Sequence, residues 1–290
     1  MIRRATPPRR CGWICREHDP FAGYAADVID THCHLTYDGL AERVGDVIAD
    51  AQAAGVDGMV SVGTHPQDAS KALELAGRYD SIFATAGVHP HYAANVTDPR
   101  SVRAFLLEVA DHPRLVALGE MGLDWHYPDP PRDIQKQVFE LQLRIMAERP
   151  DLPGIIHNRE ATDDTLAMIQ ASGLPGDRFV FHCFTGEPDE VERILAIGAR
   201  VGFTGIVTFK SAKNVAEASD RVPLDRLMIE TDSPYLTPAP HRKVRPNEPK
   251  YVPLVAEFLA ERRDMSVGEL TAATDANARG FYRWPAANAD

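Results

Sequence analysis

Short apolar runs alternate along the chain with longer segments in which apolar residues recur three and four positions apart. A short apolar run is typical of a buried strand, and the longer spacing is typical of one face of a helix. Helical spacing is clear over Leu40–Ala54, Pro131–Glu148 and Ala161–Ala171. The eight short runs are Val28–Ile29, Gly58–Val62, Ile82–Ala86, Leu115–Leu118, Gly154–Ile156, Phe179–Phe181, Ala199–Phe203 and Leu227–Ile229.

This alternation predicts the fold class. Strands that alternate with helices form a parallel sheet, because each helix returns the chain to the start of the next strand. Eight strands with eight crossovers favour a closed (β/α)8 barrel, an α/β TIM barrel, over an open sheet. We expect one such domain over residues 28–284, preceded by a flexible N-terminal extension over residues 1–27, which are rich in proline and arginine and show no periodicity.

Composition narrows the class of protein. With 44% hydrophobic and 25% charged residues, the chain can bury a substantial core. No apolar run approaches the roughly 20 residues that span a bilayer, and the N-terminus lacks the apolar segment of a secretory signal. We therefore expect a cytoplasmic protein with no membrane partner, and for the oligomeric state we favour a monomer. The four cysteines, which are too few for a disulfide framework, are Cys11, Cys15, Cys33 and Cys183.

The net charge of −11 argues against broad, non-specific binding of nucleic acid, which needs many basic contacts to phosphates. It does not exclude a substrate with a few phosphates, because bound divalent cations would reverse the local sign of the charge. The spacing of Cys11 and Cys15 is only weak evidence for a metal site of their own.

Polar residues at the ends of the predicted strands are the candidate site. The first run ends in His32 and His34, and in a strand these two side chains and Asp30 share one face. A histidine pair alone arises easily by chance and equally fits polar residues where a strand exits into a loop. Further strand-end residues are His89, Glu120, His157, His182 and Asp232. Because the carboxyl ends of barrel strands converge on one face, we expect these positions to meet in one pocket.

Imidazoles combined with carboxylates suit divalent ions such as Zn²⁺, Mn²⁺ or Mg²⁺. Six candidate ligands are too many for one tetrahedral zinc, and they suit two metal ions about 3.5–4 Å apart that share a carboxylate. We expect water activated by the metals, rather than a side chain, to be the nucleophile. Asp232 is the best-placed general base, although an aspartate before Ser233 and Pro234 also fits the start of a helix.

Seven ordered segments carry a family resemblance: Ile29–Leu35, Gly87–His91, Gly119–Asp124, Ile156–Arg159, His182–Gly186, Phe203–Lys210 and Glu230–Leu236. With these motifs the chain resembles the TatD family of metal-dependent deoxyribonucleases from Val28 to about Phe281. The resemblance implies a TIM-barrel phosphodiesterase in which one metal is held by His32, His34 and Asp232, the other by His157 and His182, with Glu120 bridging them.

The chain departs from the family pattern at two places. The family begins almost at the first strand, so the N-terminal extension is unusual, and a misassigned start codon would explain it. The family's Arg-Gly-x-x-Asn-x-Pro segment corresponds here to Arg242–Pro249, which lacks the glycine and is one residue longer. The placement of Arg242 is therefore open.

Candidate phosphate contacts are His89, Arg159, Lys210 and Arg242, each of which equally fits an ordinary surface charge. Trp125 and Tyr127 follow the Glu120 run, where aromatics can stack on bases; we favour the simpler interpretation that they cover the barrel rim. The first functional hypothesis is a deoxyribonuclease, an exonuclease that acts on single-stranded DNA or DNA ends through Asp232 and Glu120.

Two other hypotheses compete with the nuclease. An amidohydrolase or an aminoacyl-tRNA deacylase would use the same metals on a C–N or ester bond. A barrel that binds metal or a partner without catalysis belongs to a different class. The complete ligand set disfavours it, because a binding module needs no bridging glutamate.

Overall fold

The computed structural model describes residues 28–282 and 284, so the predicted extension over residues 1–27 lies outside the described part of the chain. The described residues form eight parallel strands, which are hydrogen-bonded in sequence order from β1 to β8. They are β1 (Val28–Cys33), β2 (Val56–Ser61), β3 (Ile82–Ala86), β4 (Leu115–Asp124), β5 (Gly154–Arg159), β6 (Phe179–Phe181), β7 (Arg200–Phe203) and β8 (Leu227–Ile229).

The sheet closes on itself where the chain beyond β8 meets β1. The backbone N–H of Asp232 donates to the carbonyl of His32 at 2.9 Å, and the N–H of His34 donates to the carbonyl of Ser233 at 2.7 Å. The predicted TIM barrel is therefore confirmed. Closure at this point brings His32, His34 and Asp232 together at the carboxyl end of the barrel.

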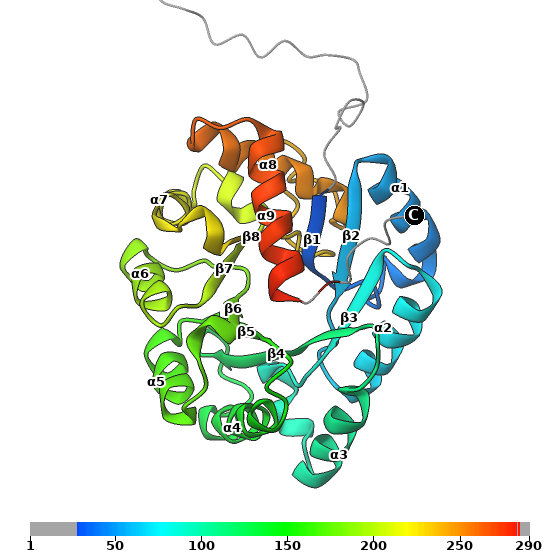
Figure 1. The fold of residues 1–290 in the computed structure, drawn as a ribbon, viewed down its shortest axis with the longest axis vertical. Coiled ribbons are helices and arrows are strands. Elements are labelled where there is room, and N and C mark those ends of the chain that lie inside the picture. The colour runs from blue at the N-terminus through cyan, green and yellow to red at the C-terminus, as the bar shows by residue number, and fades with distance from the viewer. Residues whose placement is uncertain (1–27, 283, 285–290) are drawn as a thin grey trace, which may run out of the picture.

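Helices surround the barrel, as Figure 1 shows, and each of α1 to α8 follows the strand of the same number. Two of the three helices predicted above match within one residue at each end; the first begins later, after a short 3-10 turn over Ala41–Arg43. None of the helices in the described residues is long and apolar enough to cross a membrane. The helices are α1 (Val44–Ala53), α2 (Pro66–Arg78), α3 (Pro99–Val109), α4 (Arg132–Glu148), α5 (Thr162–Ser172), α6 (Pro188–Ala196), α7 (Lys213–Arg221), α8 (Val252–Arg262) and α9 (Val267–Phe281).

Helix α9 closes the other end of the barrel. Figure 1 shows it lying across the opening beside β1 and β8. Its Asp275 carboxylate accepts the N–H of Ile29 at 3.0 Å, and the hydroxyl of Tyr282 donates to the carbonyl of Thr31 at 3.1 Å. Apolar side chains from seven strands pack with the end of this helix into one buried cluster, whose members include Val60, Ile155 and Phe281. The barrel interior is therefore apolar at this end, and the polar residues gather at the other.

Strands β4 and β5 run further than their apolar runs indicated. Glu120 and His157 lie within them, which corrects the expectation that both residues follow their strands. Pairing continues past the apolar residues because Gly122 lies opposite His157, with φ near +141°. A Cβ at this glycine would come within 2.0 Å of the His157 carbonyl oxygen, so only glycine permits this close approach. The longer strands hold both site residues on rigid backbone.

Candidate metal centre

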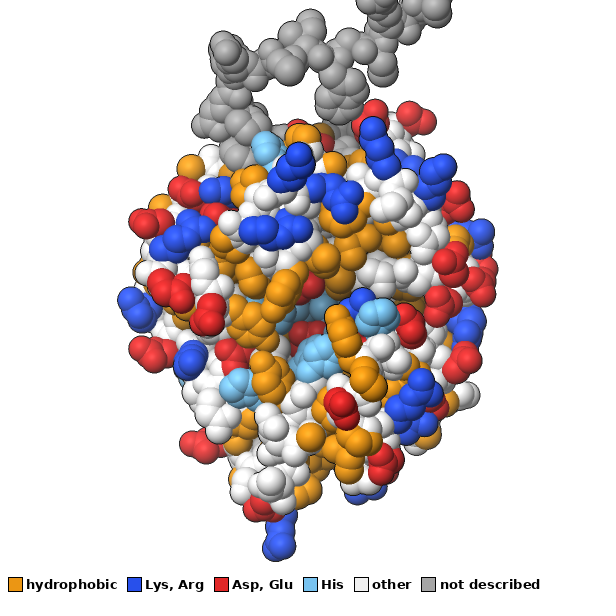
Figure 2. All heavy atoms as spheres, turned by 180° about the vertical axis from the view of Figure 1, so that it is seen from behind, with side chains coloured by type: hydrophobic (Ala, Val, Ile, Leu, Met, Phe, Trp, Pro, Cys, Tyr) orange, Lys and Arg blue, Asp and Glu red, His pale blue; other side chains and the backbone are white. Residues whose placement is uncertain are grey.

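The strand-end residues meet at the carboxyl end of the barrel, in a pocket of about 900 Å³. Figure 2 shows a hollow there, with histidine and acidic side chains at its floor and hydrophobic side chains around it. The predicted residues that line the pocket are His34, His89, Glu120, His157, Arg159, His182 and Asp232. His32 lies beneath them and is fully buried. The predicted convergence in one pocket is thus seen in the structure.

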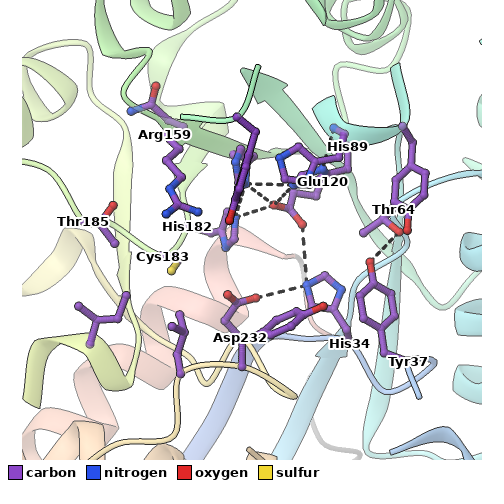
Figure 3. A pocket seen from close by; sticks show the side chains of 18 of the residues that line it. His34, Tyr37, Thr64, His89, Glu120, Arg159, His182, Cys183, Thr185 and Asp232 are labelled. Atoms are coloured by element: carbon purple, nitrogen blue, oxygen red, sulfur yellow. Dashed lines mark hydrogen bonds and ion pairs between the residues drawn. The ribbon is translucent and has the colours of Figure 1, made fainter. Parts of the chain in front are cut away.

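Glu120 lies at the middle of this group (Figure 3). Its Oε1 atom is 2.7 Å from Nε2 of His182, 2.8 Å from Nδ1 of His157 and 3.3 Å from Nε2 of His89. Burial would raise the pKa of this carboxyl group, but the adjacent His182 and His89 lower it well below its usual range. Glu120 is therefore ionised, and its Oε1 atom faces a first set of imidazoles, those of His182, His157 and His89.

The other oxygen of Glu120 faces a second set. Its Oε2 atom is 3.5 Å from Nε2 of His32 and 3.9 Å from Nε2 of His34. Oδ1 of Asp232 completes this set, 3.3 Å from Nε2 of His34 and 3.8 Å from Nε2 of His32. Asp232 adopts a left-handed backbone conformation with φ near +51°, and the next helical turn in the described chain begins only at Pro249, so Asp232 does not cap a helix. One carboxylate thus joins two groups of ligand atoms.

The donor set fits divalent metal ions. The Nε2 atom of His32, which faces Oε2 of Glu120, is buried without a hydrogen-bond partner among the described residues. Buried polar atoms are normally satisfied, so this nitrogen points to a ligand that it would bind. The ligand atoms also cluster: those of His32, His34 and Asp232 lie within 4.8 Å of one another, and so do those of His32, Glu120 and His182. Neutral imidazole and carboxylate are suitable ligands for Zn²⁺ and Mn²⁺.

A backbone contact fixes the tautomer of His89. Its Nδ1 atom accepts the backbone N–H of His91 at 3.0 Å, so in the neutral ring the proton is on Nε2. Burial lowers the pKa of His89 to about 4, which keeps the ring neutral at pH 7. Although its position beside Glu120 and His157 would allow it to bind a metal, the protonated Nε2 makes His89 a hydrogen-bond donor to the centre.

Asp124, at the end of β4, orients His157. Its Oδ2 atom is 3.0 Å from Nε2 of His157 and 3.0 Å from Nε2 of His91. Burial would lower the pKa of His157, but hydrogen bonds to Asp124 and Glu120 raise it. Because Nε2 is engaged with Asp124, Nδ1 is the atom that faces the centre, and a carboxylate in this position fixes the ring of a metal-binding histidine.

Glu230 is the corresponding residue behind His182. It is buried, and its Oε1 atom accepts the N–H of Cys183 at 2.5 Å and lies 3.7 Å from Nδ1 of His182. The carboxylate occupies space that Gly202 of β7 leaves open, since a Cβ at Gly202 would be 2.6 Å from Oε2. The glycine thus makes room for a buried acid next to a predicted metal ligand.

Asp30 and Asn247 hold the segment that carries Asp232. The fully buried carboxylate of Asp30 accepts the N–H of Thr231 at 2.9 Å and the Thr231 hydroxyl at 2.5 Å, and burial raises the pKa of this acid to about 7. The side-chain amide of Asn247 donates to the carbonyls of Thr231 at 3.1 Å and Tyr235 at 2.5 Å. Asn247, which lies in the segment that departs from the family pattern, thus anchors the backbone on either side of Asp232.

The four predicted phosphate contacts are not all in the same place. His89 and Arg159 line the pocket, and the guanidinium of Arg159 lies 5.2 Å from the centre of the Tyr127 ring. Lys210 and Arg242 are exposed and lie outside the pocket wall. The guanidinium of Arg242 packs on the ring of Phe209, 3.8 Å from its centre, which places it beside the segment that carries Lys210.

Comparison with known proteins identifies the family. A family model described as "TatD related DNase" matches residues 29–283. The chain belongs to the TatD family. The resemblance carried by the seven motifs is confirmed, and the family match covers all the predicted metal ligands from His32 to Asp232.

Relatives of this TatD-family protein are named as hydrolases. The chain is 40% identical over 256 residues to an uncharacterized metal-dependent hydrolase, YabD, of Bacillus subtilis, covering 88% of this chain and 99% of the relative. It is 36% identical over 261 residues to the 3'-5' ssDNA/RNA exonuclease TatD of Salmonella typhimurium, covering 88% of this chain and 98% of that one. The crystal structure of YJJV, a TatD homologue of Escherichia coli K12, superposes with a TM-score of 0.82 at 27% identity, covering 89% of this chain and 98% of that one. The protein is thus a metal-dependent hydrolase of the TatD family.

The residues that orient the ligands were not predicted. Asp124 lies four residues beyond Glu120, and a period of two continued through Gly122 would have placed both side chains on one face. Glu230 directly follows the last run but gives no signal of its own, because its role depends on the empty space at Gly202 in the neighbouring strand.

Proposed function

We propose that this TatD-family protein is a deoxyribonuclease that hydrolyses phosphodiester bonds at the ends of DNA or in single strands, using two divalent metal ions. The observation that supports this most directly is the position of Glu120, whose two oxygens lie between two separate groups of histidines. A shared carboxylate of this kind is typical of two-metal sites that cleave phosphate esters. The exonuclease name of the Salmonella relative supports the same class of substrate.

In this proposal His32, His34 and Asp232 would hold one ion and His157 and His182 the other, with the carboxylate of Glu120 available to both. Mg²⁺, Mn²⁺ or Zn²⁺ bound there would polarise the phosphate and lower the pKa of water. The protein supplies the rigid frame for this chemistry, since β1, β4 and β5 carry His32, Glu120 and His157.

The proton and the phosphate are handled by the chain's own side chains. The carboxylate of Asp232 is 14% exposed and faces the pocket. Burial would raise its pKa, but His34 and His32 lower it, so Asp232 is ionised at neutral pH and able to accept a proton from water. His89 donates its Nε2 hydrogen to a phosphoryl oxygen, and Arg159 contacts an adjacent phosphate.

The test is a panel of labelled substrates with the full chain. Single-stranded DNA, duplex DNA, RNA, aminoacyl-tRNA and small amides are incubated with Mg²⁺ or Mn²⁺, and the products are resolved by length. We expect nucleotides released from DNA, and Asp232→Asn lowering the rate by about 10²–10⁴-fold, as the loss of a general base does. Hydrolysis of amides or aminoacyl esters without any cleavage of DNA would instead support the amidohydrolase or deacylase. Metal binding without turnover of any substrate would support the non-catalytic barrel.

A further inference from the structure

Two exposed tyrosines stand at the mouth of the metal pocket. In the described part of the chain, the large hydrophobic side chains that are exposed are Tyr235 at 51%, Tyr127 at 47% and Val244 at 38%. Both tyrosines line the pocket, and Val244 does not. Because both rings are open to solvent in the wall of the pocket, they are available to contact a ligand that enters it.

The two tyrosines lie on opposite sides of the pocket. Tyr127 comes three residues after β4, and Tyr235 lies in the segment after β8. The strands follow one another around the barrel in sequence order, so β4 and β8 are half a turn apart. The metal ligands on the floor of the pocket therefore lie between the two rings, in the hollow that Figure 2 shows bordered by hydrophobic side chains.

The backbone and ring of Tyr127 are held in place. Its N–H donates to Oδ1 of Asp124 at 3.2 Å, and its ring meets the edges of His91 and His126 with centres 5.2 Å and 4.9 Å apart. Arg159 lies against the same ring and adds a cation. One side of the pocket therefore offers a fixed ring beside a positive charge, which are the two groups that a nucleotide's base and phosphate would contact.

Tyr235 is held in a similar way on the other side. Its N–H donates to the carbonyl of Asp232 at 3.0 Å, and its carbonyl accepts the side-chain amide of Asn247. Its ring meets that of Tyr37 edge to face, with centres 6.4 Å apart. Tyr235 is thus tied to the backbone of a predicted metal ligand, while half of its side chain remains open to solvent.

We propose that Tyr127 and Tyr235 are stacking platforms for the two unpaired bases on either side of the scissile phosphate. This inference rests on the proposed nuclease function. Glu120 is only 2% exposed, so a phosphate must descend into the pocket to reach the centre, and its two nucleosides then lie at the height of the rim. Every base has a π face, so stacking on tyrosine tolerates any sequence. Bases that stack on the rim cannot remain paired, which makes the substrate single-stranded at the cleaved end.

The experiment compares Tyr127→Ala and Tyr235→Ala with Tyr127→Phe and Tyr235→Phe, which keep the ring. Val244→Ala is the matched control, because it removes an exposed hydrophobic side chain outside the pocket wall. The substrates are a labelled single-stranded oligonucleotide and the same chain with abasic sites at the two nucleotides that flank the scissile phosphate. KM and kcat are measured with Mn²⁺, and the metal content of each variant is determined.

Each alanine variant should raise KM by about 5- to 150-fold on the normal oligonucleotide, the change expected for the loss of one stacked base. The phenylalanine variants and Val244→Ala should stay within about twofold of the wild type, because ring stacking is untouched. The wild type should lose affinity for the abasic substrate, and the alanine changes should then cost nothing further.

Two results would overturn the inference in distinguishable ways. If the wild type cleaves the oligonucleotide but neither alanine variant changes KM, or if the wild type cleaves the abasic substrate equally well, the platforms are refuted and the nuclease stands. The comparison of the two substrates needs only the wild type, so it decides the question even for a variant that fails to fold. If the wild type cleaves no oligonucleotide, the proposed function fails and the platforms fail with it.

Discussion

Replacing Glu120 by glutamine removes the one charge that faces both halves of the centre. The amide keeps a neutral oxygen at a site where the carboxylate lies 2.7 Å from His182 and 3.5 Å from His32. Two unit charges 4 Å apart interact by about 4 kcal/mol at an effective dielectric constant of about 20, and a divalent ion carries two such charges. An energy of about 4 kcal/mol is roughly a thousandfold in affinity, so Glu120→Gln should weaken both metal sites by at least about that factor.

Metal stoichiometry by elemental analysis and the rate of oligonucleotide cleavage are measured on the same preparations. Glu248→Gln is the matched control: Glu248 is also buried, but its partners are Arg43 and Lys250 rather than the histidines. This control should keep both ions. If Glu120 were a carboxylate in an exposed ion pair, its loss would cost under about 1 kcal/mol. A Glu120→Gln protein that holds both ions and cleaves at the normal rate would refute the shared carboxylate, and with it the main reason to prefer a phosphodiesterase with two metals.

Three further experiments test the two separate metal sites and the role of the N-terminal extension: substitution of single ligands, a pH series and a shortened chain. His157→Ala should empty one site preferentially and His34→Ala the other, and equal loss of both ions from each variant, by elemental analysis, would contradict separate sites. On acidification the ion at His157 and His182 should leave first. Burial opposes protonation of both rings, but Asp124 and Glu120 raise the pKa of His157, and Glu120 raises that of His182. At the other site Asp232 raises the pKa of His34, but burial lowers that of His32, so protons compete for only one of its two rings. Metal content measured from about pH 7.5 to 5 checks the order, and the opposite order would count against it. A chain that begins at Asp27 should keep its circular dichroism spectrum, its melting temperature and its activity, because the family match begins only at residue 29; loss of folding would show that the extension contributes to the core.

The strands were predictable because parallel strands buried on both faces are nearly continuous apolar runs. The residues at which the strands end were less predictable. Strand β4 continues to Asp124 through Glu120 and Gly122, residues that interrupt the apolar pattern while the backbone pairing with β5 goes on. The local sequence describes hydrophobicity along one strand, whereas the length of a strand also depends on the register with its neighbour.

The candidate ligands were predictable for a related reason. Histidines at the ends of several strands form an unusual pattern, and the barrel topology alone brings them together. The orienting acids do not stand out in this way, because Glu230 acquires its place only from the missing side chain at Gly202. The sequence places Tyr127 at the barrel rim but does not show that it is 47% exposed. The exposed fraction of a side chain depends on segments that are far apart in the sequence, so a local sequence pattern cannot predict it.

The placement of these residues separates the chemistry of the site from its choice of substrate. His32, Glu120 and His157 lie within strands whose lower ends are fixed by the apolar cluster and α9, so their positions do not depend on the surrounding loops. Tyr127 and Tyr235 lie on segments beyond the strands, above the ligands. Changes at the two tyrosines should therefore alter which substrate binds while the metal content stays constant, and changes at the ligands should abolish turnover of every substrate. Measuring metal content alone therefore cannot distinguish a nuclease from another hydrolase on this barrel, and the variants at the rim are the ones that test the choice of substrate.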